Sequence, residues 1–216
     1  MKVEQEIDSY LEVLKVINEI NNLHKAFSLE RADFLNYNLR KNVKTVVNSS
    51  GINDNFSVLI NQYKRELNAS VTCFLDIQMT FPNLRYRIKQ GESISEKLLY
   101  YMTDAHQNGE VPLNKCLNDF LGFRILVPNL DAIYNCLNLD EDLNKVVKLY
   151  LRKDGQYKGA HIYFKNGNNK FFPWELQLWD IDQAETNELS HKEHKQKRKY
   201  ISLPQNYHDG NLEKEG

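Results

Sequence analysis

The chain lacks the features that mark several broad classes of protein. Its formal net charge is −1 over 216 residues, so no excess of cations identifies a general nucleic-acid-binding protein. No segment approaches the ~18 consecutive apolar residues of a membrane span, and the first residues lack the apolar core of a signal peptide. We therefore expect a cytoplasmic protein with no membrane partner.

Cysteine is also scarce. Cys73, Cys116 and Cys136 are odd in number and widely spaced, which matches neither a disulfide framework nor a zinc site. His191 and His194 have no further ligands nearby in the sequence, so they predict no zinc site either. What is present is an ordinary composition, 41% hydrophobic and 26% charged, in a chain long enough to bury one substantial core.

The hydrophobic pattern changes along the chain. Apolar residues at steps of three and four predict an amphipathic helix over 4–26, and a second helical run extends to about Met79. Short alternating or apolar segments then predict strands. The predicted strands are 84–89, 121–127, 146–151, 159–164 and 171–178. Further helices are expected from Ser93, where Ser-Ile-Ser-Glu resembles a capping box, and over about 131–137 and 180–200.

These elements predict an α+β fold in which a mixed sheet of about five strands is flanked by helices. We expect residues 1–80 to form a helical region packed on the core. Residues 81–203 would form the main domain, and residues 204–216 a flexible tail.

The first polar cluster runs Arg-Ile-Lys-Gln-Gly-Glu-Ser-Ile-Ser-Glu-Lys over residues 87–97. Arg87 and Lys89 share a face of the expected strand, and Ser93 and Lys97 share one side of the expected helix. A strand end, a glycine and a helix N-terminus with converging donors suit a phosphate group. The alternative is a solvated basic edge with an ordinary N-cap serine.

The second cluster is Asp119-Phe-Leu-Gly-Phe-Arg124. The aspartate precedes a buried strand, where it could hold Mg²⁺ together with phosphate oxygens. The arginine lies within that strand, which is costly unless it has a partner or lines a site. The alternative is an ion pair between Asp119 and Arg124 that stabilises the strand.

The third and fourth clusters follow in the last strands. Tyr157 lies close to Lys153 and could stack on a purine, while His161 could meet a phosphate or a hydroxyl, or be structural. Glu175 and Gln177 share one face of an otherwise apolar strand. The glutamate would suit a general base or a second metal ligand, and the alternative is a water-exposed face of a half-covered sheet.

Together the four clusters resemble the synthetase domain of the RelA/SpoT family, which makes the alarmones ppGpp and pppGpp. The family motifs are Arg-x-Lys-x3-Ser-x3-Lys, Asp-x-x-Gly-x-Arg, Tyr-x-x-x-His and Glu-x-Gln, and all occur here in that order over about 84–200. We see neither a His-Asp hydrolase signature nor a regulatory extension. The resemblance therefore implies a small, synthetase-only enzyme that transfers pyrophosphate from ATP.

The resemblance also implies the donor site. Arg87 and Arg124 would sandwich the adenine of ATP. The phosphates would be held by Lys89, Ser93 and Lys97.

The same resemblance implies the catalytic and acceptor residues. Asp119 would bind Mg²⁺, and Glu175 would assist the metal or activate the acceptor's 3′-hydroxyl. Tyr157 would stack on the acceptor base, with His161 and Gln177 near its sugar and phosphates. Lys153 would bind the acceptor as well.

Two departures from the family fall on the acceptor side. Family members usually read Gly-Tyr-Arg-Ser-x-His, whereas residues 156–161 read Gln-Tyr-Lys-Gly-Ala-His. They usually continue Glu-Ile-Gln-Ile-Arg-Thr, whereas residues 175–180 read Glu-Leu-Gln-Leu-Trp-Asp. The motifs of the ATP side are intact, which points to a changed acceptor.

A toxic branch of small RelA/SpoT-like enzymes performs this chemistry on the 3′-CCA end of tRNA and is restrained by an antitoxin. We expect this chain to belong to that branch, with GDP or GTP as the alternative acceptor. A catalytically silent nucleotide-sensing module is a further alternative, although both carboxylates are present. Two basic patches could meet RNA or simply be solvated helix faces. They are Arg40-Lys41 with Lys44, and Lys192, Lys195, Lys197, Arg198 and Lys199.

Overall fold

A five-stranded mixed sheet forms the centre of the molecule. The computed structural model describes the backbone of residues 2–199 and the side chains of residues 7–190, 192 and 193. The strands, in sheet order, are β3 (Arg85–Ile88), β4 (Leu121–Val127), β7 (Trp174–Asp180), β6 (Tyr157–Phe164) and β5 (Val147–Asp154). β4 and β7 are parallel and the other neighbours are antiparallel. The predicted α+β fold with a mixed sheet of five strands is confirmed.

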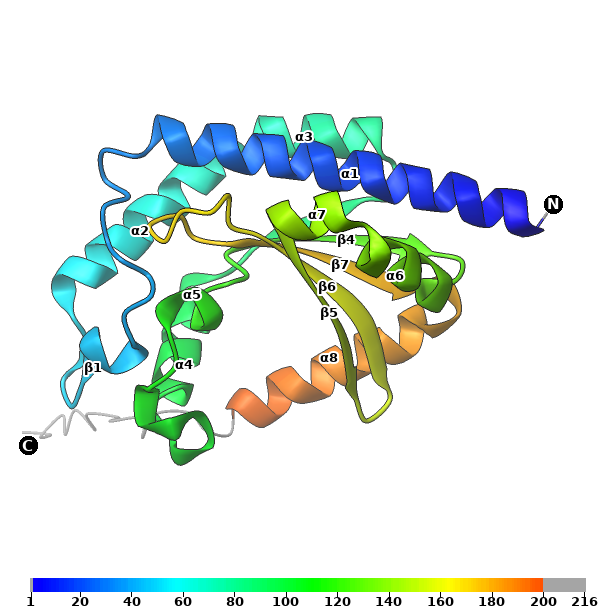
Figure 1. The fold of residues 1–216 in the computed structure, drawn as a ribbon. Coiled ribbons are helices and arrows are strands. Elements are labelled where there is room, and N and C mark those ends of the chain that lie inside the picture. Colours follow the sequence, from blue (N-terminus) through cyan, green and yellow to red (C-terminus); the bar gives the residue numbers. More distant parts are fainter. Residues whose placement is uncertain (1, 200–216) are drawn as a thin grey trace, which may run out of the picture.

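Helices lie on both sides of this sheet (Figure 1). On one side are α1 (Lys2–Glu30), α2 (Asp54–Ala69), α3 (Val71–Thr80), α6 (Leu130–Leu139) and α7 (Glu141–Val146). The other side carries α8 (Ala184–Lys199), with α4 (Gly91–Tyr100) and the short α5 (Leu113–Cys116) beyond one end of the sheet. The smaller elements are η1 (Val43–Thr45), β1 (Val47–Asn48), β2 (Gly51–Ile52), η2 (Asp104–Gly109) and η3 (Ile181–Gln183).

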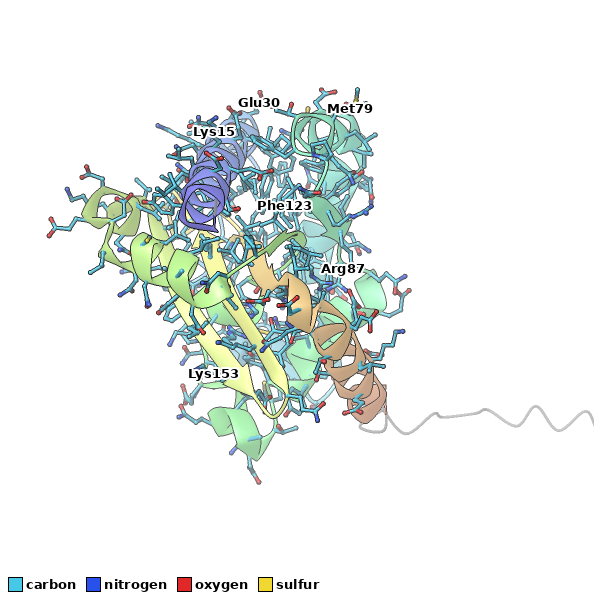
Figure 2. All side chains as sticks on the ribbon, turned by 90° about the vertical axis from the view of Figure 1, so that its right-hand side faces the viewer. Lys15, Glu30, Met79, Arg87, Phe123 and Lys153 are labelled. Atoms are coloured by element: carbon cyan, nitrogen blue, oxygen red, sulfur yellow. The ribbon has the colours of Figure 1, made fainter. Side chains whose placement is uncertain are left out.

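The core lies between the sheet and the first group of helices. Trp174 of β7 is fully buried there, and its indole N–H donates to the hydroxyl of Tyr63 over 2.7 Å. Its ring contacts Phe27 of α1, Phe74 of α3 and Phe123 of β4, at centroid distances of 5.3, 5.7 and 6.2 Å. The N-terminal helices and the sheet therefore share one apolar core, which covers one face of the sheet (Phe123 in Figure 2).

Several local predictions needed correction. α4 begins at Gly91 with Gln90 as its N-cap, so the capping box expected at Ser93 is wrong and Ser93 lies within the first turn. The second helical run is divided at Ser70 into α2 and α3. Neither the β1–β2 hairpin nor α7 was predicted. The expected tail at 204–216 lies outside the described residues, among which no helix has the length and apolar character to cross a membrane.

Candidate functional site

The sheet face opposite the core is polar, although much of it is buried. Alternation along the strands places a set of polar and aromatic side chains on this face. They are Arg85, Arg87, Arg124, Glu175, Gln177, Trp179, Tyr157, His161, Tyr163, Lys148, Tyr150 and Arg152. The parallel register sets Gly122 beside Glu175 and Arg124 beside Gln177. The last three clusters predicted from the sequence therefore meet at the centre of one sheet.

Asp119 binds two lysines just before β4. Lys89 Nζ lies 2.5 Å from Oδ2 of Asp119, and Lys97 Nζ lies 2.9 Å from Oδ1. Burial alone would raise the pKa of this carboxyl, but the two ammonium groups lower it well below its usual range. Asp119 is therefore ionised at neutral pH, and the Asp119–Arg124 ion pair considered from the sequence does not form.

The N-terminus of α4 lies at this group of cations. Gln90 makes no side-chain capping hydrogen bond, and Ser93 is half-buried in the first turn. Lys64 of α2 also reaches this point, because a Cβ added to Gly91 would lie 3.0 Å from its Nζ. No motif pointed to Lys64, because α3 separates it in the sequence from the cluster at residues 87–97. A helix N-terminus with three lysines close by is suited to a polyphosphate.

Glu175 is buried, with 7% of its surface exposed, so it does not lie on a water-exposed face. Its Oε1 is 2.8 Å from His161 Nδ1, and its Oε2 accepts from Gln177 Nε2 over 2.8 Å. Burial alone would raise the pKa of this carboxyl, and the nearby charge of Asp119 raises it too. The contacts with His161 and Gln177 outweigh both and lower it. Two ionised carboxylates thus lie at neighbouring strands, Asp119 just before β4 and Glu175 on β7.

A directed chain of hydrogen bonds extends from Glu175 across β6. Since the ionised carboxylate can only accept, Nδ1 of His161 carries the proton and its Nε2 accepts from the Tyr157 hydroxyl over 2.7 Å. The Trp179 indole N–H in turn donates to the Tyr157 oxygen over 3.2 Å. Burial, ahead of the effect of Glu175, raises the pKa of Tyr157 to about 12, so its phenol keeps the proton it donates.

Gly159 and Trp179 occupy one space. They lie opposite each other on β6 and β7, and a Cβ at Gly159 would fall 3.0 Å from Trp179 Cδ1 and 2.7 Å from the Tyr157 hydroxyl. The indole therefore needs a residue without a side chain at position 159. Both positions are among the departures noted in the sequence, and this contact couples the two changes physically.

The guanidinium of Arg124 stacks on Trp179, 3.4 Å from the ring centroid. It also pairs with Glu188 of α8 and donates to Gln177 over 3.3 Å. Burial lowers the pKa of Arg124, Glu188 opposes this effect, and the charge of Arg87 lowers it further. Arg87 pairs with Gly122, two residues before Arg124, so the two arginines are diagonal neighbours on one face of β3 and β4. A cavity of about 590 Å³ opens beside Arg124 between the sheet and α8, large enough for a nucleoside.

The hairpin β5–β6 places a further cation, Arg152, on the site face. Arg152 lies opposite Gly159 on the site face and donates to the Tyr163 hydroxyl over 2.6 Å, whereas Lys153 is the next residue and falls on the other face. Figure 2 shows Lys153 near the tip of this hairpin. Lys158, beside Tyr157, turns away to Asp131 of α6. Strand alternation could have shown that Arg152 and Lys153 lie on opposite faces, since neighbouring residues of a strand point to opposite sides.

The donor set fits a magnesium ion. Asp119 and Glu175 offer ionised carboxylate oxygens, the hard ligands that Mg²⁺ prefers, and the phosphates of a nucleotide would supply further oxygens. No group of three or more His, Cys, Asp or Glu residues that could hold a metal occurs among the described residues. A site of this kind would therefore depend on the nucleotide for part of its shell.

The two basic patches predicted from the sequence remain untested. In the first, Lys44 pairs with Glu110 and Lys41 lies 5.1 Å from the ring centroid of Tyr37, so part of its charge is engaged within the chain. In the second patch, Lys192 is the one residue whose side chain the structure describes. The side chains of the other four residues lie outside the described part of the chain.

Comparisons with known proteins found similarity among solved structures alone. No family model matches the chain, and no curated protein matches it. A solved structure, the small alarmone synthetase 1 from Bacillus subtilis bound to AMPCPP, is similar at 17% identity with a TM-score of 0.32. The match covers 69% of this chain and 80% of that one. Its low score adds no support beyond what the site itself provides.

Proposed function

We propose that the chain is an ATP-dependent pyrophosphokinase that transfers the β,γ-pyrophosphate of ATP to a ribose 3′-hydroxyl. The observation that carries this proposal is a pair of ionised carboxylates: Asp119, which contacts two lysines, and the buried Glu175, which is held by His161 and Gln177. Such a site can neutralise a polyphosphate at Lys89 and Lys97 and still present an acceptor group to Glu175. Phosphoryl-type transfer requires chiefly positioning and charge neutralisation.

On the donor side, the adenine of ATP would lie between Arg87 and Arg124, which are near neighbours. The phosphates would bind at the N-terminus of α4, close to Ser93 and Lys97, with Lys64 as an additional cation. Lys89 and Lys97, which contact Asp119 in this structure, would then turn partly from its carboxylate to the phosphate oxygens. Asp119 and Glu175 would hold Mg²⁺, which when bound would withdraw charge from the phosphates.

On the acceptor side, Glu175 would receive the proton of the attacking 3′-hydroxyl. Its orientation is fixed by His161 and Gln177, each at 2.8 Å. The attacking oxygen would form a bond to the β-phosphorus, and the bond from that phosphorus to the α–β bridging oxygen would break, leaving AMP. Because Tyr157 and Trp179 fix His161 from behind, the carboxylate is preorganised before the acceptor arrives.

We further propose that the acceptor is the 3′-CCA end of tRNA. A free guanosine diphosphate or triphosphate brings several 5′-charges that must be neutralised. Near Tyr157, however, Arg124 is paired with Glu188 and Lys158 with Asp131. The indole of Trp179 stands where the family has an arginine, and it packs edge-on to the Tyr157 ring at 5.9 Å. This environment favours a terminal nucleotide that carries a single phosphodiester.

A label-transfer assay tests both parts of the proposal. Purified protein with Mg²⁺ and γ-³²P-ATP is offered GDP, GTP and deacylated bulk tRNA, with the Glu175→Gln variant as the inactive control. Label on tRNA supports the proposal, and periodate oxidation of the tRNA 3′-end should abolish it. Label on GDP or GTP alone would make the chain an alarmone synthetase, and no label on any acceptor would refute pyrophosphate transfer.

An enzyme that blocks tRNA aminoacylation would arrest its own cell, so a proteinaceous antitoxin partner is part of this proposal. Expression of the chain alone should stop growth, and the Asp119→Asn variant should not. Unimpaired growth of cells that contain the active chain would contradict a role as a toxin.

A further inference from the structure

The open face of β5 carries an arrangement of side chains that pyrophosphate transfer does not use. Lys148, Tyr150 and Arg152 alternate along the site face of this strand, so their Cα atoms are spaced by about 6.6 Å. Tyr150 is 52% exposed, and among the described side chains it is the one aromatic residue with this degree of exposure. A cation, an exposed ring and a second cation thus follow one another on the outermost strand of the sheet.

Two further lysines lie beside this strand. Tyr163 of β6 is the cross-strand partner of Lys148. Lys165 comes two residues after Tyr163, just past the end of β6, and is therefore diagonal to Lys148. Lys115 of α5 is exposed and lies close enough, together with Lys148, to lower the pKa of Lys165, although burial is the larger cause. None of these three lysines has an ion pair within the described part of the chain. Like charges held together without an acid favour binding of an anion.

This group is continuous with the site through aromatic contacts. The ring of Tyr150 lies 6.1 Å from that of Tyr163, which lies 6.4 Å from the ring of His161. The Tyr163 hydroxyl accepts from Arg152, and Tyr163 is the cross-strand partner of Glu175 on β7. Lys148, Tyr163 and Glu175 thus form one row across β5, β6 and β7, so a ligand on β5 would lie two strands from the carboxylate that would receive the acceptor's proton.

We infer that Lys148, Tyr150, Lys165 and Lys115 form a track that binds a single strand of RNA just upstream of its reactive 3′-terminal nucleotide. A base would stack on Tyr150, and the flanking backbone phosphates would meet the lysines on one side of the ring and Arg152 on the other. Single-stranded nucleic acids are bound in this way, by aromatic platforms placed between cations. The inference rests on the proposed function for its choice of RNA, and it deepens that function by naming the surface that reads the strand.

The ring between the cations distinguishes this track from a site for a free nucleotide. A 5′-di- or triphosphate requires cations that converge on one point, whereas Lys148 and Arg152 lie on either side of Tyr150 along an extended strand. The acidic residue on the same face, Asp154, lies at the turn, beyond Arg152 from the lysines. The alternating order matches the alternating base and phosphate of a polynucleotide.

The first test measures binding without catalysis. Fluorescence anisotropy of a labelled single-stranded RNA ending in CCA is followed with the full chain and no ATP. Tyr150→Ala should weaken binding by about fivefold to 150-fold, the loss expected for one stacked base, while Tyr150→Phe should bind as the parent does. Equal RNA affinities of the Tyr150→Ala variant and the parent would overturn the track. Displacement of the labelled RNA by GTP, added at the same concentration as the RNA's phosphate groups, would overturn it as well.

The second test uses salt dependence. In the double variant Lys148→Gln/Lys165→Gln, the slope of log K against log salt should fall by about 1.4, since each lost phosphate contact removes about 0.7. The matched control is Lys15→Gln/Lys25→Gln on α1, across the sheet from this face, whose slope should not change (Lys15 in Figure 2). An unchanged slope in the first variant would remove the lysines from the track.

The two proposals fail separately. RNA binding that depends on Tyr150, without transfer of label to RNA, would keep the track and reject the tRNA acceptor. Transfer to tRNA that is unaffected in the Tyr150→Ala variant would keep the acceptor and reject the track. ATP affinity, measured by titration, should be the same in the parent and in every variant of the track, which shows that the fold and the donor site are intact.

Discussion

Replacing Gly159 with alanine tests the central feature of the acceptor side. The new Cβ would fall 2.7 Å from the Tyr157 hydroxyl and 3.0 and 3.1 Å from two atoms of the buried indole of Trp179. All these distances are below ordinary van der Waals contact. The hydroxyl is held by two hydrogen bonds and the indole is 1% exposed, so neither can move aside freely. We expect overpacking to lower the free energy of unfolding by about 1–3 kcal/mol.

The neighbouring strand supplies a matched control. Gly122 lies on the same face of the sheet, and a Cβ there would meet no atom within 4 Å. Gly122→Ala should therefore be neutral or slightly stabilising, whereas Gly159→Ala should lower the melting temperature by about 2–12 °C for a chain of this size. Both are measured by urea and thermal unfolding monitored by circular dichroism.

A double-mutant cycle identifies the cause. In a Trp179→Ala background, the space beside position 159 is vacant, and Gly159→Ala should cost at least 0.5 kcal/mol less than it does in the parent, with a coupling of about 0.5–3 kcal/mol. If the two substitutions are additive, the indole does not determine what residue 159 can be. The inference that Gly159 and Trp179 are physically coupled would then be wrong.

Three other predictions follow from the buried polar groups. Without the contact from His161, the pKa of the Glu175 carboxyl should rise, so carbon-13 NMR of a His161→Phe variant should show it titrating at higher pH than in the parent. Asp119 has a lowered pKa and binds fewer protons folded than unfolded, so its contribution to stability is complete above about pH 4 and is lost as the pH falls below that value. An Asp119→Asn variant should be less stable at pH 7 and lose less on acidification, and parallel curves of stability against pH would contradict this. Tyr63→Phe leaves the buried indole N–H of Trp174 without its acceptor and should cost about 1–3 kcal/mol in urea unfolding; a change within error would refute it.

Much of the fold could be predicted from residue patterns. The strands at 84–89 and 121–127 were found because turns bound them and their apolar residues alternate or run together, and both correspond to β3 and β4. The pattern also identified the face of β7, where Trp174 lies in the core and Glu175 opposite it. It did not show that Glu175 is itself buried, because the covering side chains come from elements distant in the sequence.

The failures have local causes. The serine at position 93 was taken for an N-cap, but Gly91 allows the helix to begin earlier, close to the amino group of Lys64. Ile7 and Leu11 fit a helical stripe, yet they are 53% and 47% exposed, because the sheet does not extend beneath the start of α1. Arg152 was not singled out, because the cluster of cations was considered without applying the strand's alternation.

The parallel register of β4 and β7 has a consequence for folding kinetics. The hairpin β5–β6 closes over a two-residue turn, whereas β7 can pair with β4 only after the helices and hairpin between them have formed or been looped out. Loop-closure entropy makes such distant pairing slow. Since Asp119 precedes β4 and Glu175 begins β7, the two carboxylates approach each other in that late step. A newly synthesised chain therefore acquires its chemistry only when folding is nearly complete, which separates the time of synthesis from the onset of activity.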